Sequence, residues 1–201
     1  MAARSLVLAS TSPYRRELLT RLQIPFEVCA PGVDEAALPR EAPRETALRL
    51  AQSKAEAVAQ TRHGALIIGS DQVAALEGQS IGKPGGHEKA VAQLKAMRGK
   101  CVTFHTALAL LDAGTGALQL AEVPTDVYFR SCSDEEIERY VATERPYDCT
   151  GSAKIEGLGV ALVEKIVSDD PSALIGLPLM QLVTFLRNEG LWVLESGTNG
   201  L

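Results

Sequence analysis

The sequence lacks the features that would place it in a membrane, outside the cell or on a nucleic acid. Its first apolar run, Leu6 to Ala9, is far too short to cross a bilayer or to form the core of a signal peptide. Its net charge is −5, whereas a general nucleic-acid binder usually carries a broad basic surface. A small polyanion stays open as a ligand, because a local cluster of cations is enough to bind one. We therefore expect a cytoplasmic protein that binds neither membranes nor nucleic acids.

Motifs built on cysteine, histidine or the phosphate-binding glycine loop are missing as well. The four cysteines form no C-x-x-C pair and no histidine lies at zinc-finger spacing, so we expect free thiols. The three histidines belong to no Ser/His/Asp order and to no H-E-x-x-H motif. Gly82-Lys83-Pro84 is not part of a G-x-x-x-x-G-K-[ST] loop. A zinc finger, a covalent serine or cysteine nucleophile and a P-loop nucleotide hydrolase are therefore unsupported.

The composition is that of an ordinary globular protein, with 46% hydrophobic and 22% charged residues. A length of 201 residues is enough for one domain with a sizeable core, or for two small lobes that share a sheet. We expect a single domain of two lobes over residues 1–194, followed by a flexible tail at 195–201.

The pattern of apolar residues predicts an α/β protein in which strands and helices alternate. Because two long strands follow one another directly, at 101–111 and 118–129, we expect a mixed sheet and not a purely parallel one. A short hairpin is expected around Glu77-Gly78. The other predicted strands are 6–9, 26–30, 65–69, 158–167 and 191–193, and the predicted helices are 13–22, 43–60, 87–98, 133–143 and 177–188.

The first candidate site is the hydroxyl-rich loop Ser10-Thr11-Ser12, which leads from a strand into a helix that begins at Pro13. Backbone N–H groups and the helix dipole at such a terminus favour an anion. Arg15 and Arg16 lie in the first turn, where their charges oppose the dipole unless a phosphate is bound there. The alternative is an ordinary capped surface helix with two solvated arginines. The segment alone fits both interpretations.

Two lysines are further candidate phosphate ligands. Lys54 falls on the apolar stripe of the predicted helix 43–60. It therefore either extends to the edge of that stripe, the more frequent outcome for lysine, or reaches a polar site. Lys83 lies in the rigid frame of Gly82 and Pro84 and could meet a phosphate, although this tripeptide alone is weak evidence.

Three acids are candidates for catalysis, metal binding and base recognition. Asp71 ends the apolar run 65–69, and an acid at the carboxyl end of a buried strand can bind a metal or act as a general base. The alternative for Asp71 is a turn former or a helix cap. Glu35 adds a second carboxylate, and Asp71 with either Glu35 or its neighbour Asp34 could hold a divalent cation in a shell of oxygens. Glu156, in the glycine-rich segment 151–157, can accept two N–H groups from a guanine edge; the alternative is an exposed acid in a turn.

Taken in order, these segments resemble the motifs of the Maf family of nucleotide pyrophosphatases. The resemblance extends from Leu6 to about Gly190. It implies an elongated α/β fold in two lobes, of the Maf and inosine-triphosphatase type, with the active site in the cleft between the lobes. The motifs are L-A-S-x-S-P-x-R-R at 8–16, V-D-E at 33–35, A-x-x-K-A at 51–55, G-S-D-Q at 69–72, G-K-P at 82–84 and G-S-x-K-x-E-G at 151–157.

Three positions are similar to the specificity residues of the 7-methyl-GTP pyrophosphatase subgroup, namely Tyr14, Gln72 and Glu156. Tyr14 departs from that subgroup, in which we expect Trp, but both are flat aromatic side chains that can stack on a base. The dTTP/UTP subgroup typically has Gln at the position of Glu156. The resemblance therefore implies a 7-methylated guanine base, which is cationic and suits a carboxylate and an aromatic face.

The resemblance further implies roles for the acids and for partners. Asp71 would be the proton acceptor, and Glu35 and Asp71 would bind a divalent cation such as Mg²⁺, Mn²⁺ or Co²⁺. A cytoplasmic location and a homodimer are implied as well.

The implied reaction is hydrolysis between the α and β phosphates, which releases a nucleoside monophosphate and diphosphate. The negative charges of a triphosphate repel a nucleophile, so catalysis has to neutralise charge and position water. Arg15, Lys54 and Lys83 would bind the phosphates, with help from Ser10, Arg16 and the helix N-terminus.

Two alternatives stay open. The first is a pyrophosphatase for dTTP, UTP or another non-canonical nucleotide, which a panel of triphosphates would separate. The second is a nucleotide-binding regulator of cell division that needs no turnover. Asp71 argues against the second, because a pure anion binder gains nothing from an acid beside phosphates.

Overall fold

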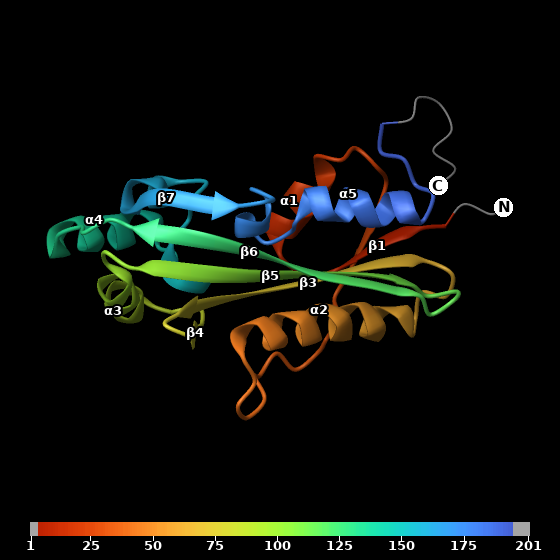
Figure 1. The fold of residues 1–201 in the computed structure, drawn as a ribbon, viewed down its shortest axis with the longest axis horizontal. Coiled ribbons are helices and arrows are strands. Elements are labelled where there is room, and N and C mark those ends of the chain that lie inside the picture. The colour runs from red at the N-terminus through yellow and green to blue at the C-terminus, as the bar shows by residue number, and fades with distance from the viewer. Residues whose placement is uncertain (1–3, 195–201) are drawn as a thin grey trace.

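A computed structural model of the chain describes residues 4–194 (Figure 1). The flexible tail expected at 195–201 lies outside the described residues. The α-helices are α1 (Pro13–Thr20), α2 (Pro43–Ala59), α3 (His87–Met97), α4 (Asp134–Glu144) and α5 (Leu179–Asn188). The strands are β1 (Leu6–Ala9), β2 (Glu27–Cys29), β3 (Leu66–Leu76), β4 (Gln79–Ile81), β5 (Cys101–Asp112), β6 (Leu118–Phe129) and β7 (Val163–Ser168). The short 3₁₀ helices are η1 (Thr150–Ser152), η2 (Leu158–Leu162) and η3 (Ala173–Ile175). None of the helices in this part of the chain is long and apolar enough to cross a membrane.

The strands of residues 4–194 form one mixed sheet, which confirms the predicted fold class. Its order is β2-β1-β3-β5-β6-β7, and β4 pairs with β3 as a hairpin. β1 is parallel to β2 and β3, whereas the other pairs are antiparallel. β3, β5 and β6 have 11, 12 and 12 residues, and they run along much of the elongated molecule (Figure 1).

Three apolar cores divide the molecule into the two expected lobes. At one end of the long strands, α1 and α5 pack on one face through residues such as Leu18 and Leu182, and the alanine-rich side of α2 packs on the other (Figure 1). At the far end, α3 and α4 cover the sheet through residues such as Leu94 and Ile137. The same long strands therefore carry both lobes, and the region between the cores lies in the middle of the sheet.

Gly69 lets α2 approach β3 at very short range. A Cβ at Gly69 would lie 2.1 Å from the carbonyl oxygen of Ala51 and 3.0 Å from the backbone nitrogen of Ala55. Both alanines are fully buried against the sheet. This close packing sets the depth at which Lys54, on the same helix, meets β3.

The edge of the sheet formed by β3 is interrupted in the middle. β1 pairs with β3 over Leu66 to Ile68, and β4 pairs with β3 over Ala74 to Leu76. Between these two stretches, residues 69–73 have no strand neighbour on this side in the described part of the chain, whereas β5 pairs with them on the other side. We name this gap the β3 notch. The last residues of β1 and of β4 both border it, so the loops that follow these strands meet there.

The notch accounts for one prediction that was wrong. Asp71 is expected to follow the end of a strand, but it lies in the middle of β3. Ser70, Asp71 and Gln72 interrupt the apolar run because they border the notch, and the chain stays extended because β5 pairs with it throughout. The change from apolar to polar residues marks an opening in the sheet and not the end of a strand.

Other predictions were wrong near the C-terminus. The predicted strand 158–167 is divided, since residues 158–162 form η2 and the strand begins at Val163. The N–H of Gly159 donates there to the carbonyl oxygen of Lys154 at 3.0 Å, so the chain turns before β7 begins. Residues 191–193 form no strand; Leu191 and Val193 pack instead against the core that α1 and α5 share with the sheet, and Trp192 is exposed. The helix predicted from residue 177 begins at Leu179, because Pro178 is its N-cap.

Candidate functional site

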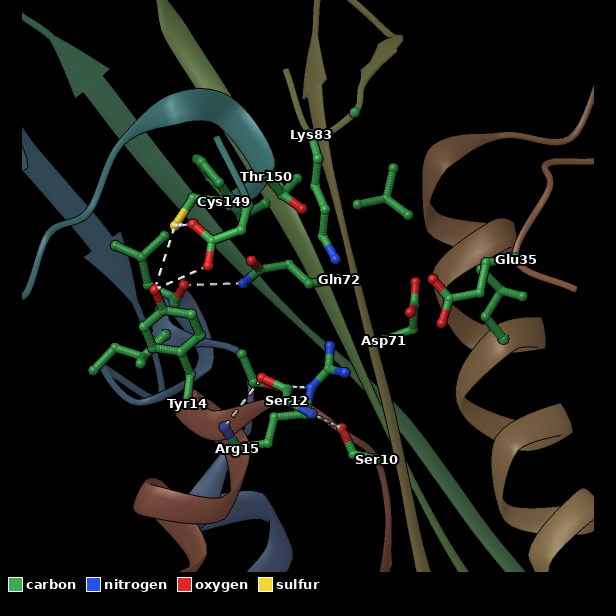
Figure 2. A pocket seen from close by; sticks show the side chains of 18 of the residues that line it. Ser10, Ser12, Tyr14, Arg15, Glu35, Asp71, Gln72, Lys83, Cys149 and Thr150 are labelled. Carbon is green, nitrogen blue, oxygen red and sulfur yellow. Dashed lines mark hydrogen bonds between the residues drawn. The ribbon is translucent and has the colours of Figure 1, made fainter. Parts of the chain in front are cut away.

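A cavity of about 610 Å³ lies at the β3 notch, between the two lobes (Figure 2). Its walls come from the loop after β1, from α2, from β3, from the segment after β4 and from residues near η1 and η3. Arg16 is exposed on α1 and is not among the lining residues. The other candidate residues line the cavity together, namely Ser10, Tyr14, Arg15, Glu35, Lys54, Asp71, Gln72, Lys83 and Glu156.

The N-terminus of α1 forms one wall, as the loop after β1 predicts. Ser12 is the N-cap, and its Oγ accepts a hydrogen bond from the backbone N–H of Arg15 at 3.4 Å. Ser10 Oγ accepts one from the N–H of Ser12 at 3.1 Å. Pro13 begins the helix, and no acidic residue lies in the first turn. The positive end of the helix dipole is therefore left for an anion in the cavity.

Arg15 turns its guanidinium from α1 into the cavity (Figure 2). Its Nε donates a hydrogen bond to the carbonyl oxygen of Gly176 at 2.8 Å, and in residues 4–194 nothing is bonded to its two terminal nitrogens. Burial lowers the pKa of Arg15, while the charges of Asp71 and Glu35 raise it. Arginine starts from so high a pKa that the group keeps its charge at neutral pH. The fork is thus held at one nitrogen and offers the other two to a phosphate.

Lys54 is buried between two carboxylates, so it reaches a polar site and does not extend to the edge of its helix. Its side chain is 4% exposed. Its Nζ lies 2.6 Å from Oδ1 of Asp71 and 2.6 Å from Oε1 of Glu35. Asp71 meets Lys54 because it points, like Ile67, to the face of β3 that α2 covers.

Glu35 and Lys83 complete this end of the cavity from two irregular segments. Lys83 follows β4 and points toward Asp71 from the side opposite α1 (Figure 2). Burial is the largest influence on the pKa of Glu35 and raises it, but the hydrogen bond from Lys54 and the charges of Lys54, Lys83 and Arg15 lower the pKa overall. Three cations and two acids from separate elements therefore face one space.

Tyr14, Gln72 and Glu156 line the cavity as well. The Tyr14 hydroxyl lies 3.5 Å from Oδ2 of Asp148 and 3.9 Å from Sγ of Cys149 (Figure 2). Burial, and then the neighbouring Cys149, raises the pKa of Tyr14, so the phenol is protonated at neutral pH. Glu156 is exposed at the rim. An aromatic ring, an amide and a carboxylate therefore line the cavity, and the cation Lys154 lies beside the ring, 3.4 Å from Oδ1 of Asp148.

The thiol of Cys149 lies beside Tyr14 in the cavity. Burial, and then the charge of Asp148, raises the pKa of Cys149 to about 11. The reactive form of cysteine is the thiolate, which is scarce at neutral pH when the pKa is so high. The four cysteines, all within the described residues, are free, as expected. The site thus contains no activated cysteine nucleophile.

Sequence analysis missed the backbone of the turn at residues 173–176. Gln72 Nε2 donates to the carbonyl oxygens of Ala173 and Leu174, both at 3.0 Å. Ser70 Oγ donates at 3.0 Å to the Gly176 carbonyl oxygen that also accepts from Arg15. Every residue has a backbone carbonyl, so the residue types do not show which carbonyls accept hydrogen bonds. The available signal was Gly176 itself, whose φ of +123° is a conformation that favours glycine.

Comparisons with known proteins agree with this geometry. The model of the family described as Maf-like protein matches residues 5–189. A relative from Cupriavidus metallidurans named 7-methyl-GTP pyrophosphatase is 59% identical, over 92% of this chain and 94% of its own. Relatives of the same name from Ralstonia nicotianae and Thiobacillus denitrificans are 59% and 58% identical, over 91% and 94% of this chain and 94% of each of their own. Because this match covers most of the chain and includes every segment that lines the cavity, the chain belongs to the Maf family.

Proposed function

We propose that the protein hydrolyses 7-methyl-GTP to 7-methyl-GMP and diphosphate. The observation that carries the proposal is the convergence of Arg15, Lys54, Lys83 and Asp71 on one cavity of about 610 Å³. A cavity of this size is typical of small-molecule sites. Similarity to relatives with this activity in their names, over 91–94% of the chain, supports the choice of substrate.

The cations neutralise the triphosphate. Arg15 offers two guanidinium nitrogens to phosphate oxygens, and Lys83 contributes a point charge from the opposite wall. Ser10 and the N-terminus of α1 add hydrogen-bond donors and the helix dipole. Positioned charges of this kind stabilise the transition state because they need no reorganisation during the reaction.

Asp71 orients and deprotonates the attacking water. Lys54 bonds to its Oδ1, and within the described part of the chain no other group is bonded to its Oδ2. The ammonium of Lys54 keeps the carboxylate in one orientation, so that the second oxygen can accept a proton from water. Cys149, which lines the cavity, is neutral at pH 7 and is not activated as a nucleophile, so water is the attacking group in this proposal.

Glu35 and Asp71 fit a divalent cation as partial ligands. Lys54 takes one oxygen of each carboxylate at 2.6 Å, and among the described residues the second oxygen of each acid has no bonded partner and would be the one to bind the cation. Among residues 4–194 no group of three or more potential ligands comes together. Mg²⁺ commonly binds through one or two carboxylates and completes its shell with substrate phosphates and water. A bound Mg²⁺, Mn²⁺ or Co²⁺ would supply further neutralisation of charge at the phosphates.

The base is recognised by Tyr14, Gln72 and Glu156. A 7-methylated guanine carries a positive charge, which favours the face of an aromatic ring and the vicinity of a carboxylate. Tyr14 can supply the ring, and Glu156 at the rim can accept N–H groups from the guanine edge. The side-chain nitrogen of Gln72 donates to backbone carbonyls, so its Oε1 is the atom left to accept a hydrogen bond from the base.

A panel of triphosphates tests this assignment. Diphosphate release is measured with 7-methyl-GTP, GTP, dTTP and UTP, each with Mg²⁺ and with a chelator. We expect the highest kcat/KM with 7-methyl-GTP and loss of activity with the chelator. Preference for dTTP or UTP would move the protein to the other substrate class. Tight nucleotide binding without turnover would favour a regulator of cell division.

The variant Asp71→Asn tests the proton acceptor. We expect it to abolish turnover and to retain a folded protein, as followed by circular dichroism. Asp126→Asn is the matched control, since Asp126 bonds to Thr103 between β5 and β6, outside the cavity. Turnover at the wild-type rate in Asp71→Asn would remove this residue from the mechanism.

We further propose that the protein acts in the cytoplasm as a homodimer. Cellular nucleotide pools are its substrate in this proposal, which fits a protein whose thiols are free. Light scattering measures the molar mass directly, and a monomer at micromolar concentration would contradict the dimer.

A further inference from the structure

The turn at residues 173–176 binds two side chains that line the cavity from different elements, Arg15 of α1 and Gln72 of β3. Gly176 accepts from Arg15, which faces the phosphates in the proposed function. Ala173 and Leu174 accept from Gln72, which faces the base. Thr106 Oγ1 also donates to the carbonyl of Ala173, at 3.0 Å. One short backbone segment therefore orients a phosphate ligand and a base ligand at the same time.

Asp170 holds this turn in place from outside the cavity. It is 3% exposed, and it does not line the cavity. Its Oδ1 accepts from the N–H of Ser172 at 3.1 Å, and its Oδ2 accepts from the N–H groups of Met180 and Gln181 at 2.7 and 3.2 Å. The carboxylate thus joins the entry of the turn to the first turn of α5, where an anion is favoured by the dipole.

Ser172 reinforces the same clamp. Its Oγ lies 2.6 Å from Oδ1 of Asp170 and 2.9 Å from the carbonyl oxygen of Leu177, and it accepts from the N–H of Leu179 at 2.7 Å. The chain between Ser172 and Leu179 is therefore closed at both ends by bonds to two polar side chains. These bonds fix the direction of the carbonyl groups in the turn. Gly176 does not fix it by itself, because glycine has little steric preference in its backbone angles.

We infer that Asp170 is a positioning residue, which acts through the 173–176 turn to orient Arg15 and Gln72 together. The inference rests on the proposed function, in which these two side chains meet the phosphates and the base. It predicts that a change at Asp170 alters both turnover and base selectivity, although the residue lies outside the cavity. If Asp170 were needed for folding alone, its replacement would change neither turnover nor base selectivity in the molecules that still fold.

The variant Asp170→Asn tests the inference. Asn replaces one of the two accepting oxygens of Asp170 by an NH₂ group, which cannot accept from an N–H group. At least one set of bonds, to the turn or to α5, is therefore lost. We expect kcat/KM for 7-methyl-GTP to fall by on the order of 10- to 100-fold, as for small misplacements of positioned groups. We also expect the ratio of kcat/KM between 7-methyl-GTP and GTP to fall. Ser172→Ala is the milder variant if Asp170→Asn fails to fold, with the same direction in both quantities.

Two control variants separate positioning from stability. Asp169→Asn makes the same chemical change at the exposed neighbouring acid. Ser133→Ala removes the N-cap of α4, whose Oγ accepts from Glu136 N–H at 3.2 Å, away from the cavity. Ser133→Ala is expected to lower thermal stability as the clamp variants do, but to leave the substrate ratio unchanged. A ratio that stays constant in the folded clamp variants as well would overturn the inference.

A spectroscopic measurement tests the inference without any substrate. The Arg15 Nε–H group is bonded to Gly176, so we expect a ¹⁵N-arginine spectrum to contain an Nε–H signal that exchanges slowly with water. The signal is assigned by its absence in Arg15→Lys. We expect Asp170→Asn and Ser172→Ala to shift it and to speed its exchange, and Ser133→Ala to leave it in place. An unchanged signal in both clamp variants would refute the positioning role even if 7-methyl-GTP proves not to be the substrate.

Discussion

Replacing Lys54 by Met is expected to destabilise the protein and to abolish turnover. The side chain is 4% exposed, and its Nζ lies 2.6 Å from an oxygen of Asp71 and 2.6 Å from an oxygen of Glu35. Met has a similar length and keeps the apolar packing of the stem, but it removes the charge. The change therefore leaves two carboxylates facing one another without a cation between them.

The size of the effect follows from how far water reaches the two acids. Removing one partner of a fully buried ion pair costs roughly 3–5 kcal/mol, because the other charge stays buried. Here the side chain of Glu35 is 57% exposed, and Asp71 borders an open cavity, so water can solvate both acids in part. We therefore expect a loss of about 1–3 kcal/mol in the free energy of unfolding. For a chain of this length, each kcal/mol lowers the melting temperature by roughly 2–4 °C.

Thermal and urea unfolding of the chelated protein at neutral pH measure this loss, and diphosphate release measures turnover. Lys89→Met is the control, since Lys89 is exposed on α3 and is expected to change stability by less than about 0.5 kcal/mol. A melting temperature of Lys54→Met equal to that of the wild type would refute the reasoning. It would mean that Lys54 does not pair with the two acids in solution.

Three further predictions concern the base, the packing of α2 and the loop before it. Glu156→Gln is expected to lower the preference for guanine over uracil and thymine bases in the triphosphate panel; equal selectivity would contradict base reading by Glu156. Gly69→Ala is expected to lose about 1–3 kcal/mol of stability in urea unfolding, because its Cβ would lie 2.1 Å from a backbone oxygen of α2. The hydrogen bonds from Arg49 lower the pKa of Glu41 from 4.5 to about 2, so its contribution to stability is present above pH 4.5 and is lost as the pH falls toward 2. Stability curves of the wild type and Glu41→Gln should therefore converge between these pH values, and parallel curves would contradict the pairing.

Much of the site was predictable because its residues break local rules. Arg15 lies in the first turn of a helix, where a cation is unfavourable, and Lys54 lies on an apolar stripe. Asp71 interrupts a run of buried residues in a strand. These three side chains line one cavity, whereas Arg16, which breaks the same rule as Arg15, is exposed outside it, so local inconsistency indicated most of the cavity lining.

The position of Asp71 within its strand was not predictable in the same way. A polar triplet after an apolar run is as typical of a turn as of a gap in a sheet. The gap exists because β1 ends at Ala9 and β4 begins its pairing at Ala74, and both facts depend on long-range pairing. The final predicted strand, at 191–193, failed for a related reason. Leu191 and Val193 pack on the core between the sheet and α1 and α5, which buries them without any strand neighbour.

By itself, the sequence determined the alternation of strands and helices, the mixed sheet and the identities of the charged residues, since periodicity and composition act locally. The tertiary structure alone decided that these charges face one cavity, that Lys54 is buried between Asp71 and Glu35, and that the 173–176 turn supports Arg15 and Gln72. The physical reason is that these contacts join segments as far as 161 residues apart. Their energies depend on burial and on backbone carbonyls, which residue types do not record.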